Sequence, residues 1–112
     1  MEINVIMENN EKIIVEVKGK INAVTAPEFE KQILSYITNG KIKIILEFSQ
    51  VDYISSAGLR SILIITKTLM GQGGKLVLSS LKKDVKEIFE ISGFTNFIPI
   101  TESLEKAEQK II

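Results

Sequence analysis

The chain has 112 residues, a usual length for one domain; 45% are hydrophobic and only 6% aromatic, so we expect a core of Ile, Leu and Val. Fourteen basic residues balance fourteen acidic ones, which disfavours nucleic acid as a direct partner. The absence of cysteine and histidine excludes disulfides and thiolate catalysis, and it removes the commonest general base and metal ligand. We therefore expect neither a metal nor another cofactor.

No apolar stretch approaches the roughly 18 residues that a membrane span needs, and the first residues do not resemble a signal peptide. No linker, repeat or low-complexity segment divides the chain. We therefore expect residues 1–112 to form one domain that resides in the cytoplasm.

Two strands are predicted at the start of the chain, over residues 3–7 and 12–18, because both segments are rich in β-branched residues. The polar residues 8–11 between them have the length of a hairpin turn. Gly19 then breaks the pattern, so the second strand is expected to end there.

The first helix is predicted to begin near Thr25, which can act as its N-cap, with Pro27 in the first turn and Glu28 completing a capping box. Gly40 is expected just beyond the end of this helix. Between them, apolar side chains recur at helical spacing and predict one buried face: Phe29, Ile33, Tyr36 and Ile37.

Strand and helix alternate in the rest of the chain. The strand predicted at residues 42–48 is continuously apolar at its centre, which is typical of a strand buried on both faces. This order predicts an α/β domain with a mixed sheet of about five strands and four helices, mostly on one side of the sheet. The predicted elements are strands at 42–48, 75–79 and 97–100 and helices at 59–70, 82–91 and 103–111.

Two serines and a glycine form the junction between the third strand and the second helix. Ser55, Ser56 and Gly58 place hydroxyl groups beside backbone N–H groups that a helix leaves without partners, and such a place receives a phosphate well. A serine before a helix is also an ordinary N-cap, worth about 1 kcal/mol. Because there are two serines, one could cap the helix while the other stays free, and Arg60 could reach a phosphate on Ser56.

The second helix has a predicted apolar stripe and one apolar residue outside it. Ile64 falls on the opposite side, near Arg60 and Lys67, which makes it a candidate partner contact, although a single exposed Ile is also ordinary. The stripe itself is expected to face the core: Leu59, Ile62, Leu63, Thr66, Leu69 and Met70.

Taken together, five segments of the chain resemble a STAS domain, and specifically the free-standing bacterial anti-sigma factor antagonists. The resemblance covers essentially the whole chain. Its segments are residues 19–26, the strand end at 46–51, the junction Ser56-Ala57-Gly58-Leu59, the Gly73-Gly74 turn and residues 91–94.

The resemblance implies a phosphorylation switch. Unphosphorylated members bind a serine kinase that otherwise sequesters a sigma factor, and so they free the sigma factor for transcription. The kinase then phosphorylates a serine at the start of the second helix, which releases the antagonist, and a PP2C-type phosphatase restores it. Aligned on Gly58 and Leu59, the phosphoacceptor is Ser56. The implied partner-binding residues are Asn22, Thr25, Ser55, Gly58, Leu59, Arg60 and Ile64.

Two residues depart from the family pattern, and they keep a second interpretation open. The family often has Asp where this chain has Ser55 and Asn22, so the junction is less negative here. The alternative is a STAS scaffold module that never carries phosphate, within a signalling or transport assembly. An enzyme is disfavoured, because a serine nucleophile would have no histidine base.

Overall fold

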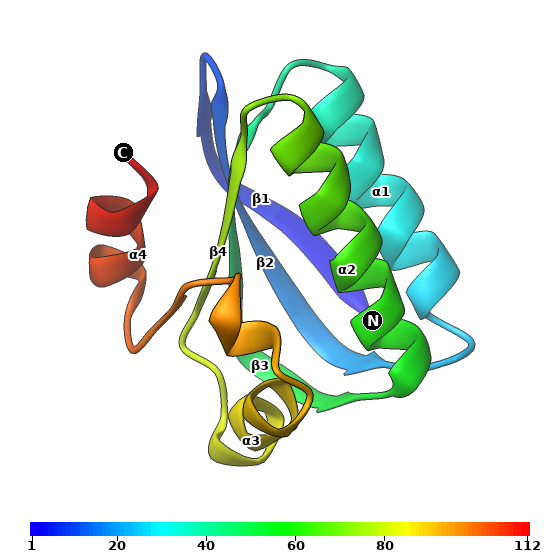
Figure 1. Cartoon of the computed structure of the whole chain (residues 1–112). Helices are drawn as coiled ribbons and strands as arrows, with labels where there is room; N and C mark the ends of the chain where they lie inside the picture. The colour runs from blue at the N-terminus through cyan, green and yellow to red at the C-terminus, as the bar shows by residue number, and fades with distance from the viewer.

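The computed structural model describes all residues, Met1–Ile112, and has one five-stranded sheet in the order β1-β2-β3-β4-β5 (Figure 1). Strand β1 is antiparallel to β2, and all later neighbours are parallel. The predicted α/β fold with a mixed sheet of five strands and four helices is confirmed. The elements are β1 Glu2–Asn9, β2 Lys12–Ile21, α1 Ala26–Thr38, β3 Lys43–Ile54, α2 Ser56–Gly71, β4 Lys75–Ser79, α3 Lys83–Ile91, a 3-10 helix Phe94–Asn96, β5 Ile100–Thr101 and α4 Leu104–Ile111.

The sheet is covered unequally on its two faces. Helices α1, α2 and α3 bury the larger core of 21 residues on one face, whereas α4 alone covers a core of five residues on the other (Figure 1). In β3, Ile44 and Leu46 belong to the larger core and Ile45 to the smaller one. Because side chains alternate between faces, the continuous apolar run in this strand reflects burial on both sides. None of the four helices has both the length and the apolar content needed to cross a bilayer.

Strands β2 and β3 run further than predicted. Strand β2 does not end at Gly19 but continues to Ile21, with register shifts on both sides of Lys18 and Gly19 where it pairs with β3. Gly19 has a φ of +103°, a conformation that side chains rarely adopt, so the glycine accommodates an irregularity inside the strand rather than ending it. The extension brings Ile21 beside Ile54, at the ends of the two strands.

The C-terminal part differs from the prediction in one strand. Residues 97–100 do not form the predicted strand. A 3-10 helix ends at Asn96, and only Ile100 and Thr101 pair with β4. Pro99 precedes the strand, and its carbonyl accepts a hydrogen bond from the Leu78 amide (3.0 Å). The proline therefore lies beside the edge strand, where its missing N–H costs no ladder bond.

The buried stripe of α2 is shifted from the predicted one. Met70 is 63% exposed, so its predicted place in the core is wrong, whereas Ile65 is fully buried and was not predicted. Ile62, Thr66 and Leu69 are buried as expected. Met70 lies about 100° further round the helix than Leu69, outside the buried face that Ile62, Ile65, Thr66 and Leu69 define.

Candidate functional site

The site is built where the parallel strands β2 and β3 end together. Ile21 pairs with Ile54, and the Ser55 amide donates a hydrogen bond to the Ile21 carbonyl (2.9 Å). The loop at residues 22–25, which leads into α1, and the serine junction, which leads into α2, therefore leave the sheet side by side. Ligands of α/β sheets bind at such carboxyl ends of strands.

The two serines of the junction have different environments. Ser55 is the extended N-cap of α2, and its Oγ accepts a hydrogen bond from the Gly58 amide (3.2 Å). Ser56 is the first helical residue; it is exposed, and its hydroxyl makes no hydrogen bond within the chain. The amides of Ser56 and Ala57 belong to the first turn, which leaves N–H groups without intrahelical partners. Ser55 therefore caps α2, and the Ser56 hydroxyl remains exposed and without a partner.

Replacing Ser55 with alanine is expected to lower the free energy of unfolding by about 1 kcal/mol, because the Gly58 amide loses its capping acceptor. The matched control is Ser56→Ala, which removes an exposed hydroxyl without a partner and is expected to change stability by less than about 0.5 kcal/mol. Urea unfolding followed by circular dichroism measures both. Equal midpoints for the two variants would show that the cap does not contribute.

Gly58 is buried at the point where α2 contacts the strand ends. A Cβ at this position would lie 2.6 Å from Ile54 Cγ1, 2.9 Å from Ile21 Cγ2 and 3.0 Å from the Ile21 carbonyl oxygen. The glycine therefore permits close packing of the helix on β2 and β3. Leu59, which follows it, is half-buried against the larger core. Gly58 is buried and Leu59 is half-buried, so these two predicted site residues contribute little to the exposed surface beside Ser56.

Asn22 and Thr25 hold the neighbouring loop through their side chains. Asn22 Oδ1 accepts hydrogen bonds from the amides of Val24 (2.9 Å) and Thr25 (3.1 Å). Thr25 Oγ1 accepts from the Asn22 amide (2.9 Å) and donates to the Lys20 carbonyl (2.7 Å). The predicted capping box is wrong, because the Thr25 hydroxyl is directed back to β2 and makes no cap hydrogen bond with α1. Both residues shape the loop beside the junction.

Arg60 and Ile64 line a shallow groove of about 350 Å³ between α1 and α2. The Ser61 hydroxyl is buried at its base and donates to Glu30 Oε1 (2.9 Å). The residues from α1 were not predicted, since the sequence does not show how closely the two helices pack. The groove is lined by Ala23, Ala26, Pro27, Glu30, Ala57, Arg60, Ser61 and Ile64.

The acidic residue of β3 nearest the junction is paired with a lysine. Asp52, the last acidic residue of β3, forms an ion pair with Lys82 at the start of α3. The hydrogen bond from Lys82, its charge and a weaker contribution from Lys20 lower the pKa of this carboxyl below its ordinary value of 3.8. Asp52 is thus ionised at neutral pH, and Lys82 offsets its charge.

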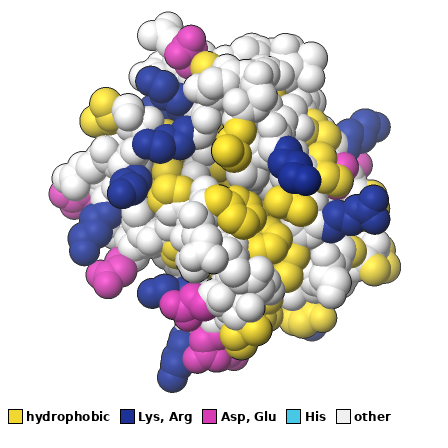
Figure 2. Space-filling model, in the orientation of Figure 1, with side chains coloured by type: hydrophobic (Ala, Val, Ile, Leu, Met, Phe, Trp, Pro, Cys, Tyr) yellow, Lys and Arg dark blue, Asp and Glu magenta, His cyan; other side chains and the backbone are white.

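The side of the molecule that carries α2 is partly apolar. Figure 2 shows a band of hydrophobic side chains across the middle of this face, over and beside α2, with Lys and Arg side chains next to it. A mixed apolar and charged surface of this kind is typical of protein–protein contacts.

Comparisons with known proteins agree with one another. A family model described as the STAS domain matches residues 4–107. BtrV of Bordetella bronchiseptica, named as an anti-sigma factor antagonist, is 39% identical over 85% of this chain and 82% of its own length. The anti-sigma-B factor antagonist of Bacillus subtilis is 31% identical over 97% of this chain and 100% of its own length. The solved structure of the Bacillus cell fate determinant SpoIIAA in its phosphorylated form superposes with a TM-score of 0.76 at 18% identity, over 99% of this chain and 100% of that one.

Proposed function

Because the chain belongs to the STAS domain family and, within it, to the anti-sigma factor antagonists, we propose that it is a binding protein switched by phosphorylation of Ser56. The relatives are regulatory proteins, so the prediction that this chain is not an enzyme is confirmed. In the proposed cycle, the unphosphorylated protein binds an anti-sigma serine kinase in the cytoplasm and releases a sigma factor. Phosphorylation of Ser56 dissociates the complex with the kinase, and a PP2C-type phosphatase removes the phosphate and so restores the form that binds the kinase.

The observation that carries this proposal is the separation of the two serines. Ser55 is occupied as the cap, whereas the Ser56 hydroxyl is exposed and unpartnered at the N-terminus of α2. The helix dipole favours a negative charge there by about 0.3–1 kcal/mol, so a phosphate would not unfold the domain. Arg60, one turn further along α2, is exposed and close enough in the helix to pair with it.

The surface around Ser56 supports a protein partner. Ala57, Arg60 and Ile64 from α2 line one groove with Pro27 from α1, next to the acceptor. A partner that covers this groove would also cover Ser56. A phosphate of about −1.5 to −2 charges would then have to lose its water within the interface, which breaks the complex without disturbing the fold.

The proposal is tested by incubating the purified protein with ATP and the anti-sigma serine kinase encoded nearest to its gene. We expect the γ-phosphoryl group to be transferred to Ser56, as located by mass spectrometry of the digested protein. The Ser56→Ala variant should accept no phosphate, whereas Ser55→Ala should still be modified. Phosphate on Ser55 would overturn the acceptor assignment. No transfer at all, with binding intact in Ser56→Asp, would favour the alternative of a STAS scaffold that is never phosphorylated.

A further inference from the structure

Three lysines form a row across the N-terminal ends of the parallel strands. Lys12 of β2 is in register with Lys43 of β3, and Lys43 is in register with Lys75 of β4. Neighbouring strands lie about 4.8 Å apart, and like charges directly opposite each other are destabilising. The two outer lysines have partners, because Lys12 Nζ pairs with Glu108 Oε1 (3.1 Å) and Lys75 Nζ donates to the Lys110 carbonyl (2.9 Å). Lys43, in the middle, has neither an ion pair nor a hydrogen bond from its side chain.

The lysine row lies on the face of the sheet that α4 covers. Two residues further along the strands come Ile14, Ile45 and Val77, which form the smaller core with α4. Since side chains on a strand return to the same face every second residue, the lysines continue this face beyond the apolar core. Their charged ends therefore meet at the margin of α4.

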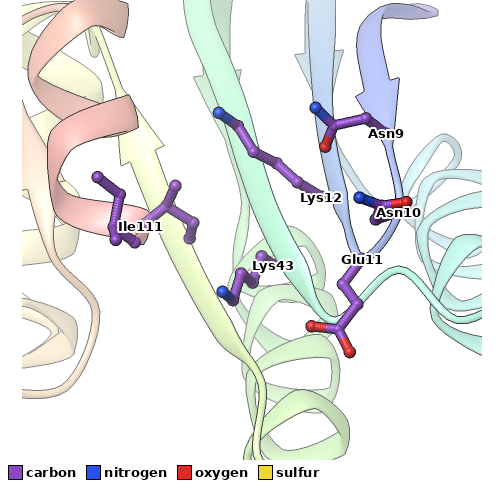
Figure 3. Close-up of a pocket in the computed structure, with 7 residues that line it drawn as sticks. Asn9, Asn10, Glu11, Lys12, Lys43 and Ile111 are labelled. Carbon is purple, nitrogen blue, oxygen red and sulfur yellow. The ribbon is translucent and has the colours of Figure 1, made fainter.

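A hollow of about 490 Å³ opens beside the row, between the β1–β2 turn and the last turn of α4 (Figure 3). Figure 3 shows Lys12 and Lys43 on neighbouring strands between the turn and Ile111, with the Glu11 carboxylate pointing away from Lys12. The side-chain amides of Asn9 and Asn10 make no hydrogen bond within the chain. The hollow is lined by Asn9, Asn10, Glu11, Lys12, Lys43, Ile111 and Ile112.

We propose that this hollow binds a small phosphorylated ligand. The ammonium group of Lys43, which has no partner within the chain, and the side-chain amides of Asn9 and Asn10 are hydrogen-bond donors that line the same hollow, which suits the several oxygens of a phosphorylated ligand. Lys12 supplies a second positive charge. Its partner Glu108 is 42% exposed, and exposed ion pairs are weak, so Lys12 can turn to a ligand. A single carboxylate, with one charge and two oxygens, would leave part of this donor set unused.

The hollow is separate from the serine junction. Lys43 begins β3, and Ser55 and Ser56 follow its last residue, Ile54, so the two places lie at opposite ends of one strand. Ligand binding at the hollow and phosphorylation of Ser56 can therefore be tested independently, and failure of one leaves the other unaffected.

The test is a titration of the labelled protein with pyrophosphate and inorganic phosphate at constant ionic strength, followed by the NMR signals of the backbone amides. We expect saturable shifts at residues 9–12 and 43 and none at the serine junction. Lys43→Gln should weaken pyrophosphate binding about tenfold, because a charge-assisted hydrogen bond is lost. The matched control is Lys67→Gln, since Lys67 is an exposed lysine of α2 without an ion pair, and it should bind as the unaltered protein does.

Three results would overturn the proposal. The first is a shift that rises linearly without saturating, which is general attraction of anions. The second is equal weakening by Lys43→Gln and Lys67→Gln while both variants melt like the unaltered protein. The third is an affinity for acetate equal to the affinity for inorganic phosphate, which would show that the hollow binds carboxylates and does not select phosphate groups.

Discussion

Replacing Ser56 with aspartate is expected to lower the affinity for the anti-sigma serine kinase at least about 100-fold while leaving the domain folded. An unpaired charge buried in an interface costs about 3–5 kcal/mol, and each 1.4 kcal/mol is a factor of ten in affinity. Within the domain the same charge lies at the N-terminus of α2, where the helix dipole accepts it. Isothermal titration calorimetry with the kinase measures the first effect, and thermal unfolding measures the second.

Two controls separate the charge at Ser56 from the loss of its hydroxyl and from added charge in general. Ser56→Ala removes the exposed hydroxyl without adding charge, so it should bind the kinase as the unaltered protein does. Ser35→Asp makes the same change at an exposed serine near the other end of α1 and should also bind normally. Normal binding by Ser56→Asp, or equal loss in both aspartate variants, would contradict an interface at the junction.

The local geometry of the serine junction could be predicted in part because its residues are consecutive. The pair of serines followed by glycine predicted that one hydroxyl caps α2 and the other is free, and the structure assigns these states to Ser55 and Ser56 respectively. Capping depends on a local hydrogen bond over three residues, which a sequence pattern contains.

The remaining features of the site depend on contacts between distant segments. The Thr25 hydroxyl could form a hydrogen bond either with the first turn of α1 or with the end of β2. In the structure it donates to the Lys20 carbonyl of β2. The groove needs Glu30 of α1 beside Ser61 of α2, a contact across 31 positions of sequence. No periodicity in either helix predicts such a pairing.

At the two positions where the resemblance led us to expect acids, Ser55 and Asn22 make hydrogen bonds without adding charge. Ser55 caps α2 through a side-chain oxygen, and Asn22 holds its loop through Oδ1. An aspartate could accept the same bonds from the same amides, but it would add a negative charge beside Ser56. The geometry of the junction therefore does not depend on the acids. Any effect of having no acid at these two positions is expected in the electrostatics of partner recognition and not in the fold.

Replacing Gly58 with alanine is expected to destabilise the domain by about 1–3 kcal/mol, the usual cost of adding volume to a packed site. The new methyl group would contact Ile54, Ile21 and the Ile21 carbonyl at 2.6–3.0 Å, and a backbone carbonyl in a parallel ladder cannot move away freely. Urea unfolding of the variant gives the change in the free energy of unfolding.

The matched control is Gly71→Ala at the other end of the same helix. A Cβ there meets nothing within 4 Å, so alanine should stabilise the domain by up to about 1 kcal/mol through its higher helix propensity. The same substitution in one helix is thus expected to have opposite signs at its two ends. If Gly58→Ala were also stabilising, propensity would outweigh packing, and the close contact of α2 with the strand ends would not be what positions Ser56.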